Sequence, residues 1–331
     1  MPEIQFKIII LAETFKLMEK KKLGNTDMMI TRIGFGAWAI GGGNWAFGWG
    51  PQDDGEAVSA IQRAAEVGMN WIDTAAVYGL GHSEELVGKA IKGMQHKPYI
   101  FTKCGLVWDE NRKTGQNLKA DSIRKECEAS LRRLGIEVID LYQVHWPVEG
   151  DIEEAWETMK QLKAEGKVRW IGVSNYNVAQ IQTCQAIAPV SSLQPPYSLL
   201  SRDYEKEILP FCLEQNIGVI VYSPMGAGML TGAMTRERIA AMPPDDWRRN
   251  NPFFQEPALT KHLALADLLK ETGKKYDRSA GETAIAWTLQ NPAVTAAIVG
   301  GRSAAQVDGI CRATDIRLTS DDLKALSGFL S

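Results

Sequence analysis

Four polar residues could together deliver a proton to an oxygen atom that gains negative charge. Tyr78 lies five residues after Asp73, while Lys103 and His145 each follow a later apolar run. A free phenol, with a pKa of ~10, is a slow proton donor at neutral pH, but a nearby ammonium group stabilises its anion. Lys103 would supply that ammonium and pair with Asp73, while His145 would donate a hydrogen bond to the reacting oxygen. The set therefore predicts general acid catalysis with a phenol as the proton donor.

Each of the four residues also has a purely structural interpretation. Asp73 could cap a turn, Lys103 could be a solvated strand end, and Tyr78 could pack on a loop rim. His145 follows an apolar run and could be a core histidine. A different chemistry is open as well, since a lysine at a barrel strand end can form a Schiff base in an aldolase.

The segments that must position these residues alternate between short apolar runs and stretches of helical period, which is typical of parallel βα units. The eight predicted strands are Ile33 to Gly36, Met69 to Asp73, Tyr99 to Lys103, Val138 to Val144, Val168 to Ser174, Ser192 to Gln194, Gly218 to Tyr222 and Ala296 to Val299. A closed barrel and a doubly wound open sheet both give this local pattern.

The polar residues that follow the strands distinguish the two folds. They are Asp73, Lys103, His145, Ser174 with Asn175, Gln194, Tyr222 with Ser223, and Gly300 to Arg302. In a barrel all of these positions converge on one mouth, whereas an open sheet gathers only some of them. The sequence therefore predicts an α/β fold, a (β/α)8 TIM barrel.

The N-terminal part is expected to fold differently from the rest. Met18 to Arg32, with the turn signal Gly24-Asn25, predicts a β-hairpin that opens the domain. Residues 1–17 are interpreted as an extension without fixed structure, and Met18 is a candidate alternative start of translation. Residues 18–331 are expected to form a single barrel domain, with the long segment from Met225 to Thr260 folded over its mouth.

Four strings carry a resemblance to a known family. They are Trp71-Ile-Asp-Thr-Ala-Ala-Val-Tyr-Gly-Leu-Gly-His-Ser-Glu-Glu-Leu-Val-Gly88, Phe101-Thr-Lys103, Asp140-Leu-Tyr-Gln-Val-His145 and Gly172-Val-Ser-Asn175. In this order they resemble the aldo-keto reductase superfamily of the bacterial type, similar to the branch that includes the potassium-channel beta subunits. The resemblance runs from about Met18 to the C-terminus. It implies a cytoplasmic NADPH-dependent oxidoreductase that reduces aldehydes or ketones with Asp73, Tyr78, Lys103 and His145 as catalytic residues.

The same resemblance implies a set of cofactor-binding residues. Ser174, Asn175 and Gln194 would surround the nicotinamide amide, and Tyr222 would stack under the ring. The stretch that would hold the pyrophosphate contains Ser223, Met225, Gly226 and Leu230, and the adenosine end would meet Gly300, Arg302 and Gln306. Arg302 favours NADP over NAD, because a guanidinium can hold a 2′-phosphate through two parallel hydrogen bonds. Gly309-Ile310 replaces the Glu-Asn of many family members, which removes their adenine contacts.

The substrate side of the mouth is less defined. Trp38, Trp108 and Trp146 fall in or next to predicted βα loops and could line a pocket for a flat or apolar carbonyl compound, although such rings also pack loops against a barrel. An alternative function within the family is a cofactor-binding regulatory subunit with slow turnover.

Composition excludes several other classes of function. A net charge of −3 lacks the basic bias of proteins that bind nucleic acids. No apolar run approaches the ~20 residues of a membrane span. The five cysteines are scattered without CxxC spacing, and no metal-ligand spacing is present, which favours a reducing compartment and predicts no metal. The expected partner is a small carbonyl compound; the oligomeric state stays open.

Overall fold

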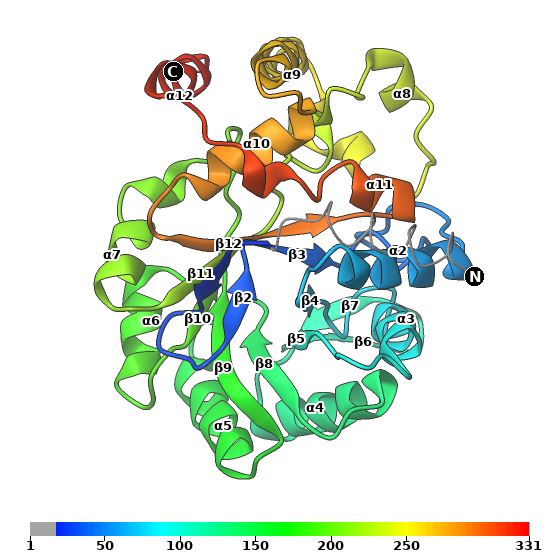
Figure 1. The fold of residues 1–331 in the computed structure, drawn as a ribbon. Coiled ribbons are helices and arrows are strands. Elements are labelled where there is room, and N and C mark those ends of the chain that lie inside the picture. Colours follow the sequence, from blue (N-terminus) through cyan, green and yellow to red (C-terminus); the bar gives the residue numbers. More distant parts are fainter. Residues whose placement is uncertain (1–17, 331) are drawn as a thin grey trace, which may run out of the picture.

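Eight parallel strands close into a barrel in the computed structural model, which describes residues 18–330 (Figure 1). In barrel order they are β3 (Ile33–Gly36), β4 (Trp71–Asp73), β5 (Tyr99–Cys104), β8 (Ile139–Val144), β9 (Val168–Ser174), β10 (Ser192–Gln194), β11 (Gly218–Val221) and β12 (Val294–Gly300). The barrel closes where β12 pairs with β3, with Ala297 opposite Ile33. The predicted (β/α)8 barrel is confirmed, and the open-sheet alternative is wrong.

Helices surround the strands, as Figure 1 shows. They are α2 (Asp54–Glu66), α3 (His82–Ile91), α4 (Ala120–Leu134), α5 (Ile152–Ala164), α6 (Val178–Gln185), α7 (Ile208–Glu214), α8 (Arg236–Ala240), α9 (Ala258–Lys274), α10 (Ala280–Leu289), α11 (Ala304–Asp308) and α12 (Ser320–Gly328). Their ends follow local chemistry: Asp53 accepts a hydrogen bond from the Glu56 amide at the start of α2, and Gly135 ends α4 with φ of +63°. Within residues 18–330 no helix has both the length and the apolar character of a membrane span.

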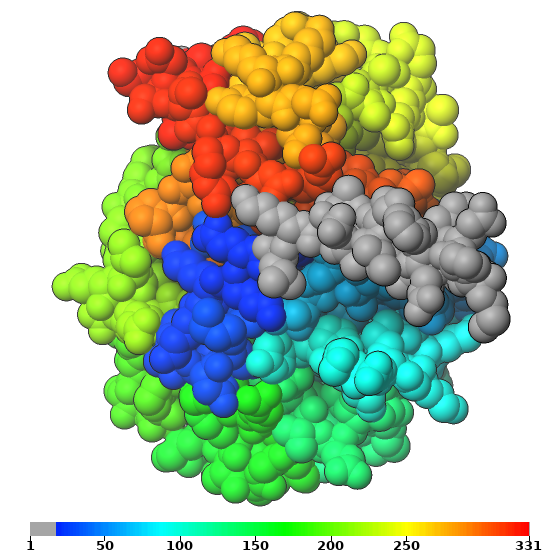
Figure 2. All heavy atoms as spheres, viewed as in Figure 1, coloured from blue at the N-terminus to red at the C-terminus, as the bar shows by residue number. Residues whose placement is uncertain are grey.

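An N-terminal hairpin closes the end of the barrel where the strands begin. Its strands β1 (Lys20–Lys22) and β2 (Met29–Thr31) pair antiparallel, as predicted. Leu23, Met28 and Ile30 pack against the interior residues Trp71 and Phe101, and the blue hairpin atoms lie on the face shown in Figure 2. The predicted extension, residues 1–17, lies outside the described residues. The site must therefore use the opposite end of the barrel.

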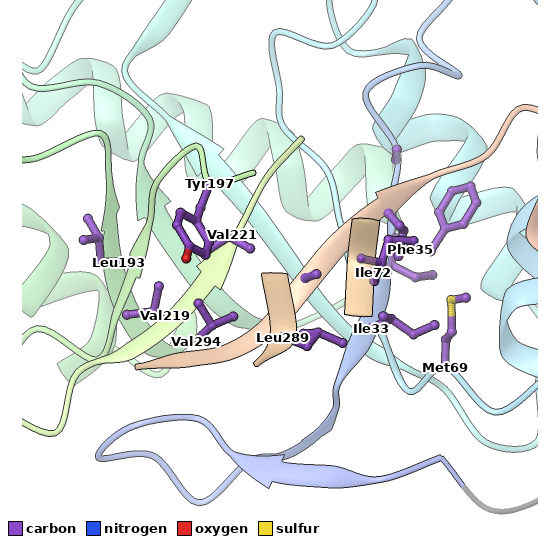
Figure 3. Packing of buried hydrophobic residues seen from close by; sticks show 14 of the residues in the cluster. Ile33, Phe35, Met69, Ile72, Leu193, Tyr197, Val219, Val221, Leu289 and Val294 are labelled. Carbon is purple, nitrogen blue, oxygen red and sulfur yellow. The ribbon is translucent and has the colours of Figure 1, made fainter. Parts of the chain in front are cut away.

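Strand alternation places the chemistry inside the barrel. Successive side chains of a strand point to opposite faces, so Ile33, Phe35 and Ile72 face outward and pack beside Met69 under the helices (Figure 3). Trp71 faces inward, where its ring lies so close to Gly34 that any side chain there would collide with it. Two residues further along β4, β5 and β8 the interior becomes polar, at Asp73, Lys103 and Gln143, which builds a layer for the site.

The segment between β11 and α9 folds over the loop that joins β3 to α2, residues 37–53. It contains η2 (Met229–Thr231), α8, η3 (Trp247–Asn250) and η4 (Pro252–Phe254). The Trp247 amide donates to the Gly48 carbonyl at 3.2 Å, and the Asn44 amide donates to the Asp245 carboxylate at 3.3 Å. These contacts hold the two loops together at the mouth.

Candidate active site

Lys103 lies at the centre of a buried polar cluster at the mouth. Its ammonium donates to Asp73 Oδ2 at 2.7 Å, to the Thr74 carbonyl at 2.8 Å and to the Tyr78 hydroxyl at 3.3 Å. The lysine side chain is fully buried and that of Asp73 is 3% exposed. Strands β4 and β5 are neighbours, and both side chains occupy inward positions near the strand ends. The two residues therefore form a buried ion pair aimed at the phenol.

Tyr78 reaches this pair from the loop between β4 and α3. Its hydroxyl end meets Lys103, while its ring centroid lies 5.7 Å from that of His145 in an edge-to-face arrangement. Gly79, with φ of +63°, lets the chain turn directly after Tyr78 and approach the Gly41 carbonyl where a side chain would not fit. The structure thus brings together all four residues for which the sequence predicts catalytic roles.

Burial sets the protonation states of the cluster. It raises the pKa of Tyr78 well above its ordinary value, and the nearby Asp73 charge raises it further, so the phenol keeps its proton at neutral pH. Burial also lowers the pKa of His145 well below 6.5, with the Lys103 charge acting in the same direction. A neutral imidazole and a protonated phenol can both donate hydrogen bonds to one oxygen atom.

The aldolase alternative does not fit this geometry. A Schiff base needs a neutral amine with an open path to the substrate carbonyl. The pKa of Lys103 is lowered from its ordinary value because burial outweighs the opposing effect of the Asp73 carboxylate, so only the contacts of the amine oppose a Schiff base. The three oxygen partners of the ammonium group already use its three hydrogens. The arrangement favours a lysine that stabilises charge on Tyr78.

Gln143 is part of the cluster but was not predicted from the sequence. Its amide nitrogen lies 3.5 Å from Asp73 Oδ1, and its amide oxygen lies 3.3 Å from the Gln194 amide nitrogen. Gln194 donates to Asp73 Oδ1 at 2.8 Å. Both carboxylate oxygens of Asp73 are therefore held. The signal was present in the alternation Leu141, Gln143, His145, which places an amide on the inner face of an otherwise apolar strand.

The predicted nicotinamide residues lie on three neighbouring strand ends beside the cluster. The Asn175 side chain donates to the His145 carbonyl at 3.1 Å and to Ser174 Oγ at 3.0 Å, and it accepts from the Tyr222 hydroxyl at 2.9 Å. Ser174 Oγ donates to the Gln194 carbonyl at 2.8 Å. Amide and hydroxyl groups of this kind can form hydrogen bonds with the carboxamide of a nicotinamide. The Tyr222 ring, held by its bond to Asn175, offers a flat surface next to them.

The predicted pyrophosphate stretch bends sharply after β11. Ser223, Gly226 and Ala227 all have φ near +55°, in the left-handed region, so the backbone turns sharply here. The Gly226 amide donates to the Ser223 carbonyl and the Leu230 amide to the Met225 carbonyl, so both are engaged within the turn. The Leu230 side chain is buried in the core, which limits its contribution to its backbone.

Arg302 lies between β12 and α11, and its side chain contacts the loop of residues 37–53. Its Nε donates to Gln52 Oε1 at 2.5 Å, and its Nη atoms donate to the carbonyls of Trp49 and Pro51. Gln306 accepts from the Arg302 amide at 2.9 Å and so braces this turn, which begins at Gly300. The guanidinium that the sequence predicts for a phosphate is thus bonded to protein oxygens.

The tryptophans predicted for the substrate pocket lie in different surroundings. Trp38 stacks on Tyr78 with ring centroids 6.3 Å apart, and the Trp45 ring centroid lies 6.2 Å from that of Tyr78. Trp146 is 42% exposed. Trp108 belongs to the hairpin of β6 (Leu106–Trp108) and β7 (Thr114–Gln116), where it lines a surface hollow of about 310 Å³. Of the three predicted rings, Trp38 has direct contact with the cluster.

No set of three or more histidine, cysteine or acidic side chains within residues 18–330 is arranged to hold a metal ion. On the outer side of β5, Glu126 of α4 accepts from the Gly105 amide at 2.9 Å and from Ser122 at 3.1 Å. Burial raises the pKa of Glu126 from 4.5 to about 7, against the lowering effect of these hydrogen bonds. This carboxyl group braces the strand end that carries Lys103.

The raised pKa of Glu126 makes the free energy of unfolding depend on pH. Between pH 4.5 and 7 the folded protein holds a proton that the unfolded chain has lost, so this group's contribution to stability falls as the pH rises. Glu126→Gln keeps an acceptor for Gly105 and removes the titration. In urea unfolding, the free energy of unfolding of the variant minus that of the wild type should rise by about 2 kcal/mol from pH 5 to pH 8. A difference that stays constant with pH would contradict the assignment.

Comparisons with known proteins agree with this architecture. The sequence profile of the aldo/keto reductase family matches residues 32–330. Aldo-keto reductase YhdN of Bacillus subtilis (strain 168) is 38% identical over 317 residues, which are 95% of this chain and 94% of that protein. The NADH-specific methylglyoxal reductase of Escherichia coli (strain K12) is 35% identical over 320 residues, 92% of this chain and 96% of that protein.

A solved structure is similar over the same length. The glycerol dehydrogenase AKR11B4 from Gluconobacter oxydans has a TM-score of 0.85 at 38% identity, covering 94% of this chain and 95% of that chain. The resemblance inferred from the four sequence motifs is confirmed. The chain is an enzyme that belongs to the aldo/keto reductase family, whose members use nicotinamide cofactors.

Proposed function

We propose that this enzyme reduces aldehyde or ketone carbonyls to alcohols, with Tyr78 as the proton donor. The observation that carries the proposal is the buried cluster in which Lys103 contacts both Asp73 and the Tyr78 hydroxyl. Proton donation by a positioned side chain typically contributes 10²–10⁴-fold to a rate. The protonated phenol and the neutral His145 both face the region where a carbonyl oxygen would lie.

Each residue has a distinct part in the proposed reaction. Tyr78 gives its proton to the carbonyl oxygen, and Lys103 stabilises the phenolate that forms, 3.3 Å away. Asp73 keeps Lys103 charged and aimed, and His145 orients the carbonyl oxygen through a hydrogen bond. A bound reduced nicotinamide supplies the hydride. Its amide would be held by Ser174, Asn175 and Gln194, with Tyr222 against the ring.

We favour NADPH as the cofactor because Arg302 lies at the adenosine end of the predicted site. A guanidinium discriminates a 2′-phosphate from a hydroxyl by charge and by paired hydrogen bonds. NAD stays open as the alternative, since the E. coli relative is an NADH-specific methylglyoxal reductase. The Arg302 side chain would have to release its present partners to meet the phosphate.

Arg302→Ala tests this cofactor assignment. We expect the dissociation constant for NADPH to rise about tenfold while that for NADH changes less than about twofold, because only NADPH carries the 2′-phosphate. Quenching of tryptophan fluorescence during titration with each cofactor measures both constants. Equal weakening of the two cofactors would mean that Arg302 is a structural residue.

The substrate class is tested with the absorbance of the reduced nicotinamide. A panel of aldehydes and ketones should include methylglyoxal, and glycerol should be tried in the oxidative direction, because two relatives carry those substrates in their names. Carbonyl-dependent oxidation of NADPH supports the proposal. Cofactor binding without turnover on the whole panel would favour a regulatory subunit.

A further inference from the structure

The loop of residues 37–53 is clasped to Arg302 through Gln52 in a reciprocal contact. Gln52 Oε1 accepts from Arg302 Nε at 2.5 Å, and Gln52 Nε2 donates to the Arg302 carbonyl at 3.1 Å. The same Nε2 donates to the Asp53 carbonyl at 3.0 Å, which fixes the amide at the start of α2. Gln52 therefore contacts both the side chain and the backbone of Arg302.

This clasp occupies the Nε edge of the guanidinium, one of the edges through which an arginine binds a phosphate. Bidentate binding of a phosphate takes two parallel N–H groups from adjacent nitrogens. Nε carries a single hydrogen, and Gln52 accepts it. The two Nη atoms donate to the Trp49 and Pro51 carbonyls. A 2′-phosphate can pair with the Nε edge of Arg302 only after the bond to Gln52 breaks.

The packing around this loop leaves two buried hydrogen-bond donors without an acceptor within the described structure. The Trp49 and Trp247 rings meet edge to face with centroids 5.9 Å apart, and their buried indole nitrogens have no hydrogen-bond partner among residues 18–330. The Arg248 guanidinium lies over the Trp49 ring, 4.3 Å from its centroid. Burial lowers the pKa of Arg302, and the nearby charge of Arg248 lowers it further. A buried donor without an acceptor opposes the arrangement that contains it.

We propose that Gln52 is a specificity-determining residue that competes with the 2′-phosphate for Arg302 and so sets the preference between NADPH and NADH. This inference rests on the proposed function, in which Arg302 meets the adenosine end of the cofactor. NADPH must displace Gln52, whereas NADH leaves the clasp in place. The amide therefore weakens NADPH binding selectively.

Two substitutions at position 52 should move the cofactor preference in opposite directions. Gln52→Leu removes the competing acceptor and should lower the dissociation constant for NADPH about three- to tenfold, a range typical of the net contribution of one hydrogen bond. Gln52→Glu adds a carboxylate that holds Arg302 and repels the phosphate, so that constant should rise about tenfold or more. The constant for NADH should change less than about twofold in both variants.

A matched control is available on the far side of the barrel. Gln161 of α5 accepts from Arg124 of α4 at 2.6 Å, so Gln161→Glu makes the same chemical change beside an arginine outside the site. It should leave both dissociation constants unchanged. Fluorescence titrations of the wild type, the two Gln52 variants and this control with NADPH and NADH give the ratio of constants for each protein.

The outcomes separate this inference from the function on which it rests. Opposite shifts of the NADPH constant in the two Gln52 variants, with NADH unchanged, support the competition. If Arg302→Ala weakens NADPH selectively but neither Gln52 variant changes the ratio, the competition is wrong and the cofactor assignment stands. If the wild type binds neither cofactor, the proposed function fails first.

Discussion

Tyr78→Phe should lower kcat for carbonyl reduction about a thousandfold while changing the dissociation constant of NADPH less than about twofold. The substitution removes the hydroxyl that accepts from Lys103 and leaves the ring contacts with Trp38, Trp45 and His145 in place. Without that proton the alkoxide would form uncompensated in a buried site. The ring volume is kept, so the fold and the cofactor site should be intact.

Tyr142→Phe is the matched control for this variant. Tyr142 is also fully buried, but its side chain lies on the outer face of β8 among core residues such as Cys104. Removal of its hydroxyl should leave kcat within about twofold of the wild type. Steady-state rates from the absorbance of the reduced nicotinamide compare the two variants directly. Near-normal turnover in Tyr78→Phe would remove Tyr78 from the mechanism.

Lys103→Met should both abolish reduction and destabilise the fold. The variant leaves the Asp73 carboxylate buried with its ionic partner gone, and breaking a buried ion pair in this way typically costs about 3–5 kcal/mol. It also removes the charge that stabilises the Tyr78 phenolate, so we expect kcat to fall at least about a thousandfold. Urea unfolding and the rate assay measure the two effects separately.

The double variant Asp73→Asn with Lys103→Met separates catalysis from folding. A neutral amide at position 73 no longer carries an uncompensated charge and can still accept from Gln194, so most of the lost free energy of unfolding should return. Activity should not return, because the phenol still lacks its ammonium. Recovery of turnover together with stability would mean that Lys103 only maintains the fold.

The residues that the sequence placed correctly are those whose positions follow from strand periodicity. Asp73 ends β4, Lys103 lies one residue before the end of β5, and His145 follows β8 directly. Because all strands of a barrel are parallel, their ends must meet at one mouth, and the four motif residues meet there. The observed strand boundaries differ from the predicted ones by a few residues; β4, for example, begins at Trp71 and not at Met69. These differences do not change where the four side chains lie.

Side chains whose partners come from distant loops could not be placed in this way. Nothing in the spacing of Gln52 and Arg302 indicates that they bond across 250 residues, because that contact depends on how two loops fold over the mouth. Trp45 and Trp108 are both loop-region tryptophans in the sequence, yet only the first contacts Tyr78. Periodicity predicts the direction of a side chain on a strand and carries no such information for a loop.

Transfer of deuterium from the cofactor to the product tests the central claim most directly. The wild-type enzyme would be incubated with NADPH that carries deuterium on the transferable position of nicotinamide C4 and with the carbonyl compound that it reduces fastest, and the alcohol would be analysed by mass spectrometry. The account predicts one deuterium on the former carbonyl carbon, with a solvent proton on its oxygen. An alcohol without deuterium, or no alcohol from any carbonyl compound on the panel, would contradict hydride transfer to a carbonyl in this site.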